Sequence, residues 1–79
     1  MIQVIFNRVD QRVARLSQNN IAEKIAQKYE LSTSNIERII EGDKFIIEVA
    51  RDDVEVSSLI DVSLESLNDS ANHVETIEK

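Results

Sequence analysis

Residues 20–42 read NIAEKIAQKYELSTSNIERIIEG, and apolar residues recur at helical spacing on both sides of a short connection. In the first half they fall at i, i+1, i+4, i+5 and i+8, which predicts a helix over residues 20–29. In the second half Ile36, Ile39 and Ile40 share one helical face, and Ser34 with Glu37 fits a capping box. We therefore expect a further helix over residues 33–41, ended by the only glycine of the chain, residue 42.

The residues before this stretch predict a strand and then another helix. Residues 1–6 show the alternation of a strand, with apolar side chains at Ile2, Val4 and Phe6. An apolar stripe at i, i+4 and i+7 then predicts a helix over residues 8–17, on Val9, Val13 and Leu16. The polar run at residues 18–20 is expected to end that helix.

The residues after this stretch fit more than one template. Residues 44–50, KFIIEVA, are β-branched and partly alternating, although the same apolar residues also form i, i+4 pairs. We expect a strand there that pairs with residues 1–6, because an isolated strand is unstable. Residues 54–67 fit both a strand and a helix, and we expect a short strand over 54–56 and a helix from 57 or 58 to 68.

Length and charge indicate one small domain over residues 1–68 and a flexible acidic tail over 69–79. The chain has 79 residues, no cysteine and one histidine, which leaves no disulfide and no thiolate metal site. Residues 1–51 contain eight Lys/Arg and seven Asp/Glu, a net charge of +1. Residues 52–79 contain one Lys and eight Asp/Glu, a net charge of −7, so the whole chain has a net charge of −6. The acidic end can be read as a solubilising tail or as a binding segment.

Several functional classes have no support in the sequence. There is no Ser/His/Asp arrangement, glycine-rich phosphate loop or metal-spaced cluster, so we expect a non-enzymatic protein without cofactor, metal or catalytic residues. No apolar run approaches the ~18 residues that a membrane span needs. We therefore expect a cytoplasmic protein that does not associate with membranes.

The pattern in residues 25–40 resembles the helix-turn-helix of bacterial and phage DNA-binding proteins. It consists of Ile25-Ala26, then the pair Leu31-Ser32, then Ile36 four residues after that serine; Glu30 stands where the family usually has glycine. The resemblance implies an α+β fold: a small, winged-helix-like helix-turn-helix domain with three N-terminal helices, a short two- or three-stranded sheet and a C-terminal helix. It also implies that the helix over residues 33–41 enters the major groove.

The same resemblance implies which residues would contact DNA. Asn35 and Arg38 on the outer face of the reading helix are of the types that bind adenine and guanine edges, while Thr33 and Ser34 suit phosphates. Three arginines at one helical spacing can also bind phosphates, or can form a solvated helix face: Arg8, Arg12 and Arg15. Lys24 and Lys28 complete the expected phosphate contacts. This predicts a small, sequence-specific transcription regulator that binds DNA, as a homodimer.

A second functional hypothesis is a protein-binding module, such as a phage- or plasmid-type inhibitor, an antitoxin or an RNA polymerase accessory factor. The acidic segment after residue 53 contains apolar residues suited to a basic partner surface: Leu59, Ile60, Val62, Leu64 and Leu67. The sequence leaves both hypotheses open.

Overall fold

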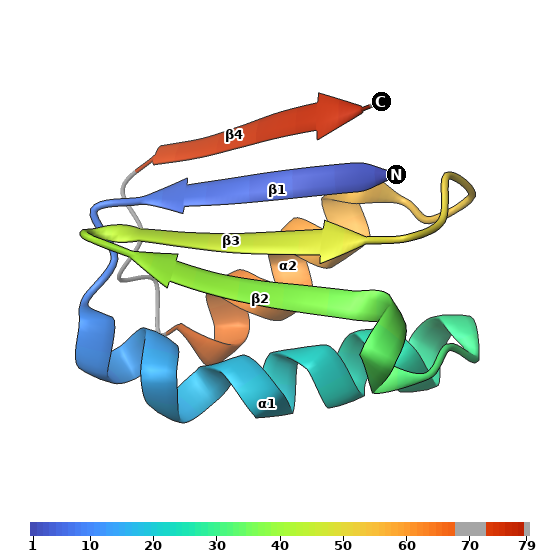
Figure 1. The fold of residues 1–79 in the computed structure, drawn as a ribbon, viewed down its shortest axis with the longest axis horizontal. Helices are drawn as coiled ribbons and strands as arrows, with labels where there is room; N and C mark the ends of the chain where they lie inside the picture. The colour runs from blue at the N-terminus through green and yellow to red at the C-terminus, as the bar shows by residue number, and fades with distance from the viewer. Residues whose placement is uncertain (68–72, 79) are drawn as a thin grey trace.

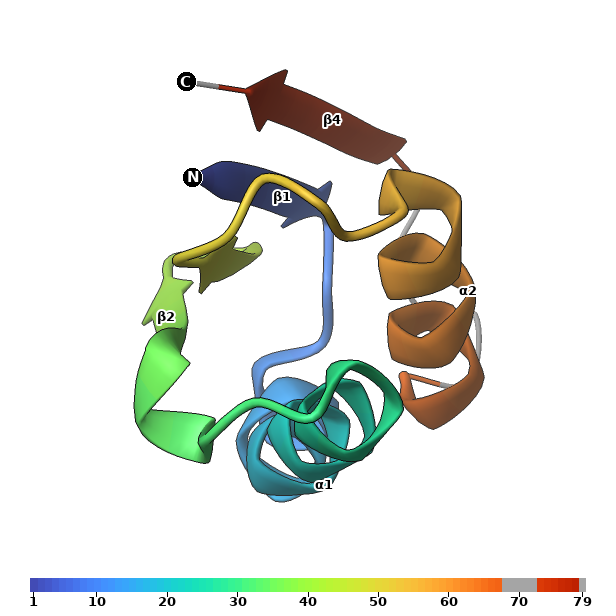
Figure 2. The ribbon, with the colours of Figure 1, turned by 90° about the vertical axis from the view of Figure 1, so that its right-hand side faces the viewer.

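Four strands form one antiparallel sheet, and two helices cover one of its faces (Figures 1 and 2). The computed structural model describes residues 1–67 and 73–78. In chain order the elements are β1 (Ile2–Asn7), α1 (Gln11–Tyr29), the 3₁₀ turn η1 (Thr33–Asn35), β2 (Ile36–Glu41), β3 (Lys44–Val49), α2 (Val56–Ser66) and β4 (His73–Glu78).

The strands lie in the order β2-β3-β1-β4. With a helix after β1 and another after β3, this is the ferredoxin-like or split βαβ arrangement. This architecture hosts many unrelated functions, so the function has to be argued from particular surfaces.

The two central strands confirm the expected pairing of residues 1–6 with residues 44–50. Ile2, Val4 and Phe6 lie opposite Val49, Ile47 and Phe45, respectively. All six side chains are buried against the helices, and the two phenylalanine rings stack with centroids 6.1 Å apart. Alternation therefore predicted the first strand, and the need of that strand for a partner predicted the second; in both, the alternate apolar residues are the buried ones.

The first two predicted helices are one continuous helix, and the prediction of a break at residues 18–20 was wrong. Asp10 caps α1, because its carboxylate accepts a hydrogen bond of 2.8 Å from the Arg12 amide. Asn19 and Asn20 are exposed on the helix, where asparagine costs only a few tenths of a kcal/mol relative to better helix formers. The helix ends at Glu30, whose φ of 55° is left-handed and whose amide donates to the Ala26 carbonyl.

The predicted helix over residues 33–41 does not form, and with it the expected helix-turn-helix is absent. Ser32 caps only the single turn η1, and β2 follows immediately. β2 and β3 form a hairpin around the two-residue loop of Gly42 and Asp43, and Gly42 has a φ of 59°. A positive φ at the first loop position alone fits a type II′ turn, so this glycine turns a hairpin and does not end a helix.

The C-terminal part confirms one helix and corrects a strand. The predicted helix from residue 57 or 58 is present as α2, while the predicted strand over residues 54–56 was wrong, since Val54 is buried in the connection to α2. Residues 69–72 and 79 of the expected tail lie outside the described residues. His73–Glu78, from the same expected tail, forms β4 beside β1. The general class, an α+β domain with a sheet and a C-terminal helix, is confirmed.

Candidate interaction surface

The face of the sheet opposite the helices carries three isoleucines in one row. Ile5 lies opposite Ile46 in the β1–β3 ladder, and Ile39 lies opposite Ile46 in the β2–β3 ladder. None of the three belongs to the hydrophobic core or packs against it. Figure 2 shows both helices on the other side of the sheet. We call this row the isoleucine stripe, and the surface around it the open face: Gln3, Ile5, Glu37, Ile39, Glu41, Lys44, Ile46 and Glu48.

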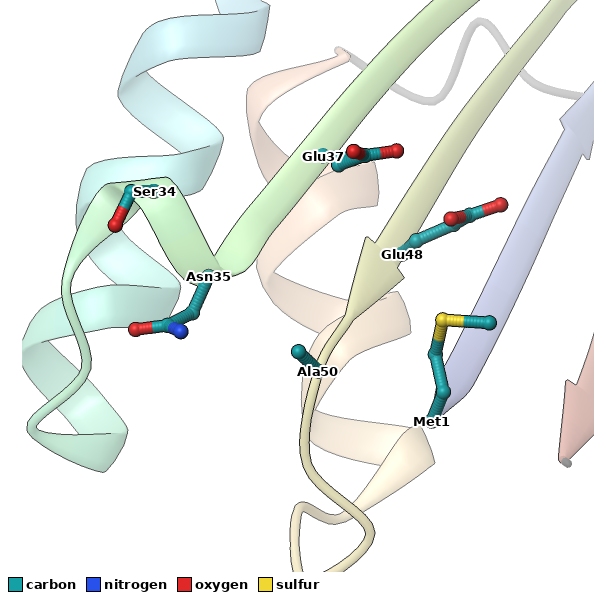
Figure 3. Close-up of a pocket in the computed structure, with 6 residues that line it drawn as sticks. All are labelled: Met1, Ser34, Asn35, Glu37, Glu48 and Ala50. Atoms are coloured by element: carbon teal, nitrogen blue, oxygen red, sulfur yellow. The ribbon is translucent and has the colours of Figure 1, made fainter.

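Carboxylates lie beside the isoleucine stripe. Glu37 and Glu48 are direct partners in the β2–β3 ladder, and like charges in such positions destabilise a sheet. The Glu48 carboxylate accepts a hydrogen bond of 2.6 Å from the Gln3 side-chain amide. Both carboxylates line a pocket of about 180 Å³ whose remaining walls are Met1, Ser34, Asn35 and Ala50 (Figure 3). The open face thus combines an aliphatic centre with negative charge.

β2 is an edge strand, since β3 is its only neighbour in the sheet. Glu37, Ile39 and Glu41 lie along the open face of this edge strand. Arg38 and Ile40 alternate with them and lie on the helix side, where both side chains are half-buried.

The structure does not gather the predicted DNA-contacting residues on one surface. Thr33, Ser34 and Asn35 form the exposed turn η1 after the C-terminal end of α1, whereas Arg8, Arg12 and Arg15 lie around its N-terminal end (Figure 1). The 19 residues of α1 span about 28 Å at a rise of 1.5 Å per residue, which separates the two groups. Arg38 lies on β2, half-buried on the helix side of the sheet.

The two predicted lysine contacts face the other helix. The Lys24 ammonium donates to the Ser66 hydroxyl at 3.4 Å, and the Lys28 ammonium donates to the Ser58 hydroxyl at 3.1 Å. The Ser17 hydroxyl also donates to the Ser66 carbonyl at 3.0 Å. These side chains connect α1 to α2, so both lysine ammonium groups are engaged in contacts between the helices.

The residues predicted to bind a protein partner belong mainly to the core. Leu59 and Leu67 are buried, which removes them from any partner surface. Ile60, Val62 and Leu64 are half-buried and pack against the same core. The physical reason is that α2 must cover the sheet, because a helix in a small domain buries its apolar stripe on its own sheet before a partner can use it.

A polar cluster fastens the 50–55 connection to the end of α1. The Arg51 guanidinium donates to the Tyr29 carbonyl at 3.1 Å and forms an ion pair with Asp53. The hydrogen bond from Arg51 lowers the pKa of the Asp53 carboxyl below its ordinary value and raises the pKa of Arg51. The Glu55 amide donates to the Tyr29 hydroxyl at 3.1 Å. This cluster is structural.

The sequence contains a signal for the isoleucine stripe that the two functional hypotheses do not use. Each of β1, β2 and β3 has one isoleucine out of phase with the alternation that fills the core: Ile5, Ile39 and Ile46. A strand with one solvated face normally places polar residues at such positions. Three such exceptions therefore indicate a second apolar surface.

Searches of protein-family models, curated proteins and solved structures gave no match. In residues 1–67 and 73–78, no three His, Cys, Asp or Glu residues form a group that could hold a metal ion. Neither of the described helices has the length and apolarity required to cross a bilayer.

Proposed function

We propose that this domain is a non-enzymatic protein-interaction module that binds a protein partner through its open face. The isoleucine stripe is the observation that carries this proposal. Side chains outside the core need no apolar character for folding, yet three neighbouring strands each present an isoleucine there. Ile5, Ile39 and Ile46 are half-buried in the sheet, so a partner that covers them gains only part of the about 1.5–3 kcal/mol that full burial of an isoleucine is worth. Three such contributions in one row can still help to anchor a partner.

The charges around the stripe indicate the kind of partner. Among residues 1–67, Glu37, Glu41 and Glu48 lie on the open face, together with one cation, Lys44. Charge complementarity favours partners of opposite sign and rejects partners of like sign. The partner surface is therefore aliphatic at its centre and basic around it, as in the second sequence hypothesis, but it meets the sheet and not α2.

Display of random twelve-residue peptides on phage tests this function without a known partner. Peptides selected on the purified domain should lose at least tenfold in affinity with Ile46→Ser, because that residue lies at the centre of the stripe. Leu16→Ser is the matched control: Leu16 is 86% exposed on α1, and its loss should leave affinity unchanged. Selection of peptides that ignore Ile46→Ser, or no selection above background, would reject the open face as the binding site.

Sequence-specific DNA binding in a transcription regulator is the second candidate function. The supporting observation is that Arg8, Arg12 and Arg15 are exposed, with no carboxylate of the described residues in ion-pair distance. Because β2 replaces the expected reading helix, these arginines would have to supply the phosphate contacts from α1 and from the connection that precedes it.

A gel-shift experiment at low salt with fragments of the source genome tests DNA binding. Arg12→Ala should weaken binding and reduce the slope of log K against log salt by about 0.9 for one lost phosphate contact. No retardation of any fragment at low salt would reject this function. The homodimer that the helix-turn-helix resemblance implies is tested separately, by sedimentation equilibrium of the protein without DNA.

A further inference from the structure

We propose that the partner contributes an extended basic segment that adds to the free edge of β2 as a fifth strand. This inference rests on the proposed function, since it places part of the partner at the margin of the open face. Strand addition to a sheet edge uses main-chain hydrogen bonds for affinity and alternate side chains for specificity.

The hairpin shows which backbone groups of β2 are directed outward. The Ala50 amide donates to the Asn35 carbonyl at 3.1 Å, which marks residues 35 and 50 as a hydrogen-bonded pair. In an antiparallel ladder such pairs recur at every second residue, so Glu37, Ile39 and Glu41 direct their N–H and C=O groups toward β3. The residues that flank a two-residue hairpin loop form a hydrogen-bonded pair, and Glu41 with Lys44 is such a pair in this alternation.

Arg38 and Ile40 have the opposite orientation. Their N–H and C=O groups point away from β3, the only strand that pairs with β2. The amide of Ile36, which shares this direction, already donates to the Thr33 carbonyl. An added strand would therefore find its donors and acceptors at residues 38 and 40.

The side chains of β2 define the partner sequence. Along the open face of this strand the order is Glu37, Ile39, Glu41. No cation of the described residues lies in ion-pair distance of either carboxylate. Side chains directly opposite on neighbouring strands come within about 4.5–5.5 Å at Cβ, and opposite charges there are stabilising. The complementary segment carries a basic residue, an aliphatic residue and a basic residue at alternate positions.

A second copy of the chain fits this edge poorly. Antiparallel pairing of β2 with itself about Ile39 would place each Glu37 opposite the copy's Glu41. Like charges directly opposite one another are destabilising. The charge pattern therefore favours a basic partner over self-association.

Two synthetic peptides test the strand addition. In TKTITKT the isoleucine would face Ile39 and the two lysines would face Glu37 and Glu41, and the sequence is the same in both strand directions. TETITET, with glutamates in place of the lysines, is its matched control. TKTITKT should bind at least tenfold more tightly, and its binding should weaken with added salt. Equal affinities of the two peptides would overturn the inference.

Amide hydrogen exchange in the unmodified protein locates the peptide. Saturating TKTITKT should slow exchange at Arg38 and Ile40 by at least tenfold, and exchange at Glu37 and Ile39 should change little, because β3 already protects them. Binding without slower exchange at Arg38 and Ile40 would overturn the inference. Slower exchange at these two residues on raising the protein concentration without peptide would assign the edge to a second copy, and would also overturn it.

Variants at Arg38 separate the edge from the rest of the open face. Arg38→Pro removes an outward N–H that β3 does not use, and Arg38→Ala keeps it. Binding should be lost in the first variant and retained in the second. If phage-selected peptides depend on Ile46 while the two Arg38 variants bind equally, the proposed function stands and strand addition is rejected.

Discussion

Glu37 and Glu48 lie directly opposite each other on β2 and β3, on the face of the sheet that the helices leave open. This pair opposes the stability of the hairpin, because like charges in direct cross-strand positions repel. Glu41 and Lys44, the two residues that flank the hairpin loop, also lie opposite each other, and they form an opposite-charge pair. The two pairs therefore make contrasting predictions for the same substitution.

Glu37→Lys should raise the free energy of unfolding by about 0.5 kcal/mol, since it replaces repulsion of Glu48 by attraction. Glu41→Lys is the matched control and should lower it by a similar amount, because it creates repulsion of Lys44. Urea denaturation at low ionic strength measures both. Equal effects of the two substitutions would show that the register does not govern these charges.

Ile46 and Ile47 are neighbours in β3 that face opposite sides of the sheet. Ile47 is 0% exposed in the core, and Ile47→Ala should cost about 2–4 kcal/mol through lost burial and the cavity left behind. Ile46→Ala should cost less than about 1 kcal/mol, since Ile46 does not pack against the core. Thermal and urea unfolding measure both losses of stability. A larger loss for Ile46→Ala than for Ile47→Ala would mean that the core lies on the Ile46 face of the sheet.

Asn19 and Asn20 test whether α1 is continuous. Inside an exposed helix, Asn19→Ala and Asn20→Ala should each stabilise the protein by about 0.5 kcal/mol, because alanine has the higher helix propensity. If a second helix began at residue 20, loss of its asparagine cap would instead destabilise by about 1 kcal/mol. The sign of the change in the urea midpoint decides between the two.

Glu30 and Gly42 have nearly the same φ, 55° and 59°, but only one of them is glycine. Glu30→Gly should stabilise the protein by about 0.5–1 kcal/mol, since glycine adopts the left-handed conformation without steric cost. Gly42→Ala should destabilise by about 1 kcal/mol for the converse reason. Outside residues 41–43, no atom of the described residues lies within 4 Å of an added Cβ at Gly42, so a loss there is conformational and not a clash.

Asp53 predicts a pH dependence. Its pKa is lowered in the folded state by the Arg51 hydrogen bond, so the interaction stabilises the fold above the ordinary pKa of 3.8 and is lost as pH falls through the lowered folded-state pKa. Asp53→Asn should remove this contribution and flatten the fall in stability at acid pH. The free energy of unfolding measured from neutral pH to below pH 3 checks this; unchanged curves would mean that the exposed pair is not formed in solution.

The strands that could be predicted from sequence are one with a clear pattern and the partner that it requires. β1 alternates clearly, whereas residues 44–49 of β3 fit a strand and a helix, and the need of β1 for a partner decided for the strand. The segment 36–41 was misread because Ile36, Ile39 and Ile40 satisfy a helical spacing, while Glu37, Ile39 and Glu41 alternate with the rest. Two β-branched runs separated by two residues that include a glycine are a hairpin signal, and this signal outweighs a short helical match.

The candidate surface was less accessible to sequence reasoning. The sequence predicts polar contacts on a reading helix and apolar contacts on the acidic segment, but α2 buries Leu59 and Leu67 of that segment in the core. The open face depends on the register of three strands, because only their alignment brings Ile5, Ile39 and Ile46 into one row. Such alignment is a property of the folded sheet and not of any one segment.

The position of β1 in the sheet has a consequence for how the protein folds during its synthesis. β1 is made before both of its partners, which are β3, beginning at residue 44, and β4, beginning at residue 73. Until residues 44–49 leave the ribosome, β1 has no neighbour, and among the elements made by then only α1 is a long segment that forms from local contacts. We expect the nascent chain to hold α1 early and to acquire its sheet late, with a slow step set by these long-range pairings.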